Sequence, residues 1–490
     1  MGILSTLLLT PVLGILILAL IPSKNTNQIR FTANLAALLA FLLSFWLVLN
    51  YDRSDGQIQF YEYFVFNPKL NTALALGVDG LSLPMVVLAA LLTVIALLAS
   101  FNIASNIKSY YVSILLLELG MLGVFLSQDW SLFYIFWELT LAPLFLLIDR
   151  WGGKRRHVAS LNFVLYTMGG SIFMLISLLA ISQYMPPHGG TLMSAMTVAA
   201  QSMPRDEQIL VLIGFLIGFG VKMPIFPLHG WLPLAHVEAP SPVSILLSGI
   251  LLKMGAYGMI RVIVMLPEAT QMLQTPLITL ALIGMIYGGV LAWRQTDMKA
   301  MVAYSSVSHM GIILLDIATM NKTGLIGAVL QMTAHGLVAG AMFLLVGLLY
   351  ERTHTRNILD YSSLVRVMPR FALFMTITLF AAMGLPGTVG FIAELHAIVG
   401  GFQQWGNLMI LLGVSIMIGT AYAMRTIGML FTGPVKPQMR NIEDLKIYEL
   451  IAAGFLVVLI VIFGLWPAPL IDLSMATMNQ MNGTIMQSIQ

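Results

Sequence analysis

The fold is decided by the stretch from Gln208 to Arg261, which reads QILVLIGFLIGFGVKMPIFPLHGWLPLAHVEAPSPVSILLSGILLKMGAYGMIR. Two apolar runs flank a proline-rich interruption, and each run carries one lysine, Lys222 in the first and Lys253 in the second. A lysine at the centre of a membrane helix costs about 2.5–3.5 kcal/mol on insertion scales. Unsatisfied backbone at membrane depth is tolerated only inside protein or beside water. The stretch therefore predicts a buried, partly hydrated path on which lysines exchange protons.

Prolines break the apolar pattern at two places. Pro224 and Pro227 interrupt the first run of this stretch, and a second break, GLPG at 384–387, contains Pro386 and is followed by Glu394. The two breaks fall five expected spans apart, so the broken segments cross the membrane in opposite directions. Paired interrupted segments at corresponding places indicate inverted repeats with a site near the membrane midplane.

Composition places the whole chain in a membrane. Of its 490 residues, 59% are hydrophobic and only 9% are charged, and the mean hydropathy is +0.91. A soluble globular protein carries about 25% charged residues. The net charge of +3 is small and its basic residues are dispersed, so nothing indicates a nucleic-acid partner. The absence of cysteine excludes disulfides, cysteine-ligated iron–sulfur clusters and thiol catalysis.

The predicted fold is an all-α polytopic membrane protein with about fourteen transmembrane helices, two inverted five-helix repeats and two broken helices. A span needs about 20 mostly apolar residues. The expected spans are 3–21, 31–49, 82–101, 112–127, 131–148, 161–183, 208–228, 240–262, 276–293, 300–318, 325–349, 370–401, 406–430 and 448–466. With the N-terminus outside, most loop lysines and arginines fall on the inner side, which supports the span count and the orientation.

The spans divide the chain into four expected parts. Residues 1–111 hold the first three spans, 112–262 the first repeat, 276–430 the second repeat, and 431–490 the last span and a tail. The connecting loops are short, and even the longest, at about 50–81 and 184–207, cannot hold a catalytic domain.

Ionisable residues recur inside the expected spans. They are Glu118, Glu138, Lys222, Lys253, His309, Asp316, His335, Glu394 and His396, with His229 in the first break. Each alone has a structural interpretation, such as a buried ion pair or a histidine bonded to a carbonyl. As a set they must pair or line water, because isolated charges at membrane depth are too costly. Burial favours the neutral amine of a lysine and a nearby carboxylate favours the ammonium, so the set indicates a proton relay.

Other site chemistries receive no support. The histidines lie on different spans without metal-ligand spacing, so no metal site is expected, and no nucleotide-binding glycine motif follows a strand pattern. The residues therefore predict no metal or nucleotide cofactor in this chain. Bound lipid in crevices against neighbouring chains is compatible with this expectation.

Several long motifs resemble the antiporter-like subunits of complex I, and the NuoM/NdhD type (the ND-four type) is the most similar. The matching stretches are GVDGLSLP (77–84), FWELTLAPLFLLI (136–148), WGGKRR (151–156), FVLYTMGGS (163–171), KMPIFPLHGWLPLAHVEAPSPVSILLSGILLKMGAYGMIR (222–261), AYSSVSHMG (303–311), HGLVAGAMFLLVGLLYERTHTR (335–356) and MGLPGTVGFIAEL (383–395). The resemblance covers residues from about 77 to 430, and its fourteen helices with two broken ones agree with the fold expected above.

The resemblance implies a role for each member of a relay. Glu138 would be the carboxylate that controls Lys222, and Lys253 the central relay lysine. His309 and His335 would continue the hydrated axis, with Glu394 as the terminal carboxylate toward the outlet. Glu118, His229, Asp316 and His396 remain secondary candidates. The subunit would act without a redox centre, in a proton-translocating NAD(P)H or ferredoxin:quinone oxidoreductase whose quinone (plastoquinone) and iron–sulfur clusters lie in partner subunits.

The resemblance also implies partners and a location. NuoL/NdhF-type and NuoN/NdhB-type subunits would be neighbours in the membrane, which would be a cyanobacterial thylakoid or a bacterial plasma membrane. Leu234, Pro242 and Asn162 depart from the usual pattern, where Asp, a small residue and Lys respectively are more usual. These departures would suit a specialised paralogue that serves CO2 uptake, in which a partner would perform CO2 hydration.

Three other functions compete with this interpretation. A subunit of an Mrp-type cation/proton antiporter would share the same buried axis and is the main alternative. A stand-alone solute carrier is disfavoured because no aromatic-lined or arginine-bearing substrate site is evident at the midplane. A scaffold whose charges only pair would tolerate replacement of Lys253.

Overall fold

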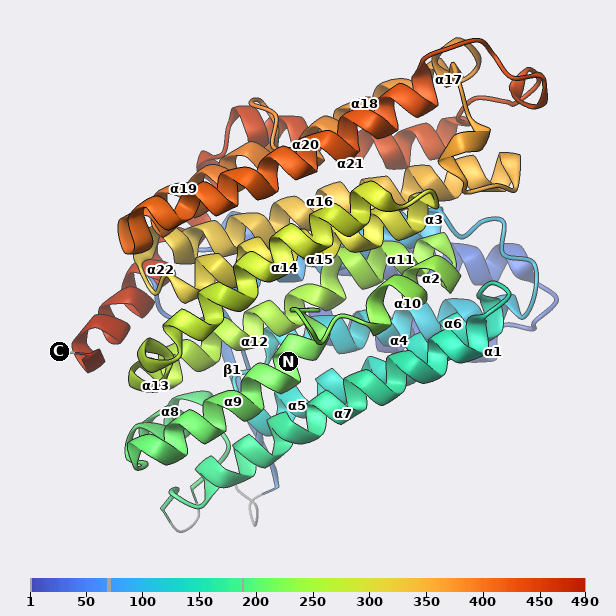
Figure 1. Cartoon of the computed structure of the whole chain (residues 1–490). Coiled ribbons are helices and arrows are strands. Elements are labelled where there is room, and N and C mark those ends of the chain that lie inside the picture. The colour runs from blue at the N-terminus through green and yellow to red at the C-terminus, as the bar shows by residue number, and fades with distance from the viewer. Residues whose placement is uncertain (1, 68–71, 187–188, 490) are drawn as a thin grey trace.

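The computed structural model describes residues 2–67, 72–186 and 189–489. Long helices run side by side over most of the molecule (Figure 1). Within these ranges, 11 helical segments are able to cross a membrane by length and composition. They are α1 (Ile3–Leu20), α2 (Thr26–Asn50), α4 (Ile107–Leu126), α5 with α6 (Trp130–Leu139, Leu141–Trp151), α7 (Arg156–Ser182), α11 through α12 (Ser241–Met265), α14 (Gln274–Arg294), α15 (Met298–Ala318), α16 (Lys322–Thr353), α19 with α20 (Val389–Phe431) and α21 (Ile447–Leu465). The protein is therefore a multi-pass integral membrane protein.

Every expected span coincides with a helix. Two expected spans are absent from the 11 segments above. They correspond to α3 (Ser82–Leu98), which is shorter, and α9 (Arg205–Lys222), which carries charged residues at both ends. The run Val389–Phe431 holds two spans, because a turn at Gly406 separates α19 (Val389–Trp405) from α20 (Ile410–Phe431). Shorter helices complete the fold: α8 (Met193–Gln201), α10 (Trp231–Glu238), α13 (Pro267–Met272), α17 (Leu364–Val367) and α18 (Pro369–Ala382).

Both expected helix breaks are present. In the first, α9 ends at Lys222 and α10 begins at Trp231, so Pro224 and Pro227 lie in non-helical chain. The Trp231 indole Nε1 donates to the Val221 carbonyl oxygen at 2.9 Å, which satisfies a carbonyl at the end of α9. In the second, α18 ends at Ala382 and α19 begins at Val389, with Pro386 between them.

Two segments form the centre of the molecule. The apolar stretches of α16 and of α11–α12 are entirely buried, whereas only 39% of the residues in that of α7 are buried. α16 packs against α15, α19, α11, α18, α21, α22 and α3, and it lies in the middle of the helix array (Figure 1). These two segments carry His335 and Lys253, so the expected relay lies in the most enclosed part of the fold.

Two elements were not expected from the sequence. The loop after α2 folds into an antiparallel hairpin of β1 (Gln59–Asn67) and β2 (Thr72–Val78). The expected tail after the last span is instead α22 (Ala468–Ile489), which packs against α12, α13 and α16. The mixed polar and apolar composition of α22 falls short of a membrane span, so the hydropathy pattern that found the other helices did not single it out.

Arg261, at the end of the expected span 240–262, forms an ion pair that was not expected from the sequence. It is the tenth residue of α12 (Leu252–Met265), and its Nη1 lies 2.7 Å from Asp79 Oδ2. The Asp79 side chain is 3% exposed, and its Oδ1 also accepts from the backbone of Leu81 and Ser82. The pair therefore ties the turn after the hairpin to the C-terminal half of α12. Breaking a buried ion pair leaves the other charge uncompensated.

Asp79→Asn is expected to destabilise this contact by about 3–5 kcal/mol, because Arg261 would remain buried without its carboxylate. The matched control is Glu268→Gln, which breaks the exposed pair with Arg205 (42% and 63% exposed side chains) and should cost at most about 1 kcal/mol. Thermal denaturation of the purified assembly compares the two variants. Equal, small shifts for both would contradict a structural role of the Asp79–Arg261 pair.

Candidate functional site

The first part of the expected relay lies where α5 meets α6. Asp129 caps α5 by accepting from the backbone of Ser131 and Leu132, and the helix ends one residue after Glu138. Lys222 Nζ donates to Thr140 Oγ1 at 3.0 Å and lies 4.9 Å from the centre of the Trp137 ring.

Glu138 itself is left without a direct partner. Its Oε1 is buried and has no hydrogen bond, and the structure records no ion pair between Glu138 and Lys222, both of which belong to the described residues. Lys222 is thus held beside the carboxylate by Thr140 and Trp137 instead of being locked to it.

The centre of the site is a direct contact between Lys253 and His335. Lys253 Nζ lies 2.6 Å from His335 Nδ1 and donates to the Ser248 carbonyl oxygen at 2.6 Å. Lys253 is 0% and His335 4% exposed. The Ser248 carbonyl belongs to a π-helical turn, Leu247–Leu251, between α11 (Ser241–Leu246) and α12. Such turns are rare in proteins overall, but many of them occur at functional sites. This one presents a carbonyl to the lysine.

Helix packing joins the region of Glu138 and Lys222 to the contact between Lys253 and His335. A Cβ added at Gly255 would lie 2.9 Å from the backbone nitrogen of Met223, the residue after Lys222. Because Gly255 has no side chain, α12 approaches the end of α9 this closely. The glycine therefore places the break after Lys222 against the helix that carries Lys253.

The row continues from His335 to His309. Their ring centres are 5.4 Å apart, and His309 Nδ1 lies 3.2 Å from Gln331 Nε2. His335 Nε2 is buried without a hydrogen-bond partner. Imidazole exchanges protons near neutral pH and uses two nitrogens to do so. Two adjacent rings, one with an unsatisfied nitrogen, suit proton transfer better than packing alone.

Glu394 closes the row at the second helix break. His309 and Glu394 line one small cavity of about 10 Å³ together with Ser308, Ser415 and Tyr422, which is about the room that one water needs. Gly384, in the break, has φ +68°, and a Cβ there would lie 2.0 Å from Glu394 Oε2. The break therefore brings its backbone against this carboxylate.

The secondary candidates fall into two kinds. Glu118 and Asp316 are 0% exposed, and all four of their carboxyl oxygens lack hydrogen-bond partners. His229 stacks on Phe226 and meets Tyr287 edge to face, with Nδ1 unsatisfied. His396 is half-buried, and its Nδ1 contacts the Ile392 carbonyl of its own helix, which agrees with the structural interpretation. The structure does not join these four residues to the row by hydrogen bonds.

A cluster of buried ionisable residues at the expected inner side of the membrane was not predicted from the sequence. Lys299 counted as a basic residue of a helix end, but it is 4% exposed, and its Nζ donates to the Ala239 carbonyl at 2.7 Å. Glu238 is buried and accepts from the backbone of Arg155, and His236 stacks on Phe343 with both ring nitrogens unsatisfied. The burial of Lys299 was not predicted because the residue lies at the start of a helix, where basic side chains normally reach water.

The arrangement is a row of acids and bases inside an apolar protein. Among the described residues, no group of three or more histidine, aspartate or glutamate side chains is placed to hold a metal ion. The members of the row can accept and donate protons: Lys253 and His335 are in direct contact, and His309 and Glu394 line a cavity that fits one water. Such a row is suited to moving protons across the width of the helix array.

The sequence matches a known family and is similar to two curated proteins over nearly its whole length. The family model described as "NADH:quinone oxidoreductase/Mrp antiporter, TM" matches residues 127–419. The chain is 40% identical over 480 residues to NAD(P)H-quinone oxidoreductase chain 4 1 of Picosynechococcus sp., covering 95% of this chain and 89% of that one. It is 36% identical over 478 residues to NADH-quinone oxidoreductase subunit M of Rickettsia conorii, covering 96% of each.

A solved structure shares the fold over nearly the whole length. A chain of respiratory complex I from Thermus thermophilus with bound NADH superposes with a TM-score of 0.87 at 29% identity. The match covers 97% of this chain and 99% of that chain. The likeness therefore includes both broken helices and the helices before and after the two expected repeats.

Proposed function

Because the chain belongs to the family of NADH:quinone oxidoreductase and Mrp antiporter transmembrane subunits, we propose that it is the proton-translocating, antiporter-like membrane subunit of a complex I-like quinone oxidoreductase. The electron donor would be NAD(P)H or ferredoxin. The observation that carries this proposal is the buried contact between Lys253 and His335. A structural ion pair would join opposite charges, whereas a lysine and a histidine are both bases. Their contact in an apolar interior is stable when they share one proton, which is the requirement for a relay.

The proposed path uses the row of residues in spatial order. Glu138 attracts a proton to Lys222, and Lys253 passes one to His335. His309 and a water in the adjacent cavity lead it to Glu394 at the second break. A change of charge at Glu138 alters the balance at Lys222, because a carboxylate favours the ammonium over the neutral amine. One pKa unit corresponds to about 1.4 kcal/mol, so small movements suffice to load or release a proton.

The chemistry of electron transfer is assigned to partners. The subunit itself is proposed to be non-redox, with quinone and iron–sulfur clusters held by other subunits. NuoL/NdhF-type and NuoN/NdhB-type subunits are the proposed membrane neighbours. As a non-redox subunit of a translocase, this chain would couple quinone reduction elsewhere in the complex to proton movement along its own row.

Purification through a tag on this chain separates the proposal from its main alternative, an Mrp-type cation/proton antiporter subunit. The proposal predicts that iron–sulfur signals in electron paramagnetic resonance and quinone reductase activity purify together with the chain. The fold and the row are common to both functions, so only the partners distinguish them. Purification with membrane subunits alone, in an assembly that exchanges sodium for protons without electron transfer, would contradict it.

A finer question is whether the assembly serves CO2 uptake. The departures at Leu234, Pro242 and Asn162 motivate this variant, and similar identities to a Picosynechococcus and a Rickettsia relative do not discriminate between a thylakoid and a plasma membrane. We favour a respiratory or photosynthetic quinone reductase as the parent function. Recovery of a CO2-hydrating partner in the same purification would instead assign the chain to the CO2-uptake variant.

A further inference from the structure

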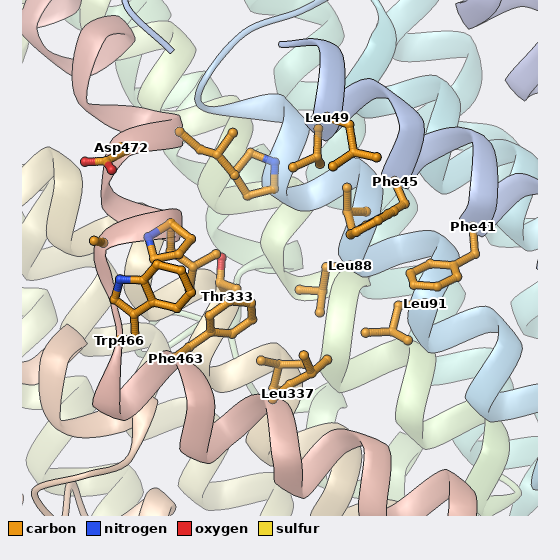
Figure 2. Close-up of a pocket in the computed structure, with 18 of the residues that line it drawn as sticks. Phe41, Phe45, Leu49, Leu88, Leu91, Thr333, Leu337, Phe463, Trp466 and Asp472 are labelled. Carbon is orange, nitrogen blue, oxygen red and sulfur yellow. The ribbon is translucent and has the colours of Figure 1, made fainter. Parts of the chain in front are cut away.

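A large apolar groove lies away from the proton row, between α2, α3, α16 and α21. Its volume is about 430 Å³. Figure 2 shows Phe41, Phe45 and Leu49 on one side, Phe463 and Trp466 on the other, and Leu88, Leu91, Thr333 and Leu337 between them. The groove has the size of a small-molecule site, and the row of residues proposed above does not line it.

The groove has one polar end. Among the described residues, the charged ones that line it are Arg53, just after α2, and Asp472, in the first turns of α22. Both are exposed, and the structure records no ion pair for either of them, although both lie in its described part. Trp466, at the same end, is 65% exposed. Indole rings gather at the boundary between head groups and hydrocarbon, so this end lies at a membrane surface, the outer one in the expected orientation.

The apolar part has the depth of one leaflet. From Leu49 to Phe41 on α2, and from Phe463 to Phe455 on α21, the walls extend about 12 Å at 1.5 Å per residue. Half of a hydrocarbon core is about 15 Å thick. A groove that begins at charged groups on the membrane surface and ends near the midplane has the shape of one acyl chain below one head group.

The floor of the groove connects it to the relay helix. Thr333 and Leu337 both line it, and they lie one turn apart on α16. His335, midway between them in sequence, projects about 200° away around the helix. An occupant would therefore pack against the back of the turn that presents His335 to Lys253.

We propose that this groove binds one glycerophospholipid of the outer leaflet, with its phosphate at Arg53 and a hydrogen-bond donor of its head group at Asp472. The acyl chain fills the space between Phe45 and Phe463 and contacts α16. A cation and an anion at one rim fit a head group that carries a phosphate together with an ammonium or hydroxyl group, because each then receives a complementary partner. The proposal does not depend on proton translocation.

Photo-crosslinking tests the site in the intact purified complex. The probe is a phosphatidylethanolamine with a diazirine on the middle of one acyl chain, and adducts are located by peptide mass spectrometry. Adducts are expected at Leu88, Leu91, Thr333 or Leu337. Arg53→Gln should reduce them roughly tenfold, the loss of one charge-assisted hydrogen bond. Labelling of the outward-facing Leu165 on α7, 56% exposed, provides the internal reference.

Controls separate a built site from general contact with lipid. Arg366→Gln removes an exposed arginine from a different part of the surface and should leave the labelling of α3 and α16 unchanged. A diacylglycerol probe with the same chain, which lacks the phosphate, should label these residues weakly. Equal labelling by both probes, no effect of Arg53→Gln, or adducts on a neighbouring subunit that covers the groove would each overturn the proposal.

Discussion

Lys253→Met is expected to reduce coupled turnover by roughly 100-fold while leaving the assembly intact. Methionine has a similar length and is accommodated in apolar surroundings, so packing around α12 changes little. It cannot take part in proton transfer, and His335 loses the neighbour that lies 2.6 Å away. The size of the effect follows from the usual contribution of a positioned proton-transfer group, about 10²–10⁴-fold. Quinone reductase activity in membranes, with assembly followed on a native gel, measures it.

The matched control for this variant is Lys322→Met. Lys322 begins α16 and is exposed, so the same change of residue removes the same charge outside the row. It should leave turnover within about twofold, as surface substitutions usually have little effect. If both variants lost turnover equally, the loss would reflect charge or assembly and not a relay.

Gly384→Ala is expected to reduce proton translocation roughly 10- to 100-fold through its effect on Glu394. The residue has φ +68°, and a left-handed backbone costs an L-residue about 1–2 kcal/mol. The added Cβ would also lie 2.0 Å from Glu394 Oε2, so the carboxylate must move. Displacement of a reacting group by about 1 Å can cost a factor of about 100. Proton uptake by vesicles that contain the complex measures the loss.

Two further variants show whether Gly384→Ala acts through Glu394. Gly413→Ala adds the same methyl group to α20, where no atom lies within 4 Å of the new Cβ, and should be neutral. Glu394→Gln should lose translocation by itself, and the double variant Gly384→Ala with Glu394→Gln should lose no more than Glu394→Gln alone. Additive losses would mean that the glycine acts on folding and not on the carboxylate.

The membrane helices were predictable because each depends on local hydropathy. The break after Lys222 was predictable for the same reason, since Pro224 and Pro227 interrupt the helix wherever it lies in the fold. Hydropathy did not reveal the hairpin β1–β2, because its strands of 9 and 7 residues are too short for a span, or helix α22, because its composition is mixed.

The residues of the site could be identified from the sequence, but the contacts between them could not. A rare lysine or histidine inside an apolar run stands out, so Lys253 and His335 were found, but their contact joins positions 82 residues apart. The π-helical turn that supplies the Ser248 carbonyl has no pattern in sequence. The burial of Lys299 and Arg261 was not predicted, because it depends on neighbouring helices, and residues at helix ends usually reach water. The individual roles along the row remain predictions.

The most direct test of the central claim is the number of protons taken up per quinone reduced. It would be measured in sealed vesicles for the wild type, Lys222→Met and Lys253→Met, with assembly verified for each. The row described here predicts that both variants assemble and that this ratio falls, or that turnover collapses with it. If both variants assemble and still pump protons at the wild-type ratio, the two lysines are structural and the proposed path is wrong.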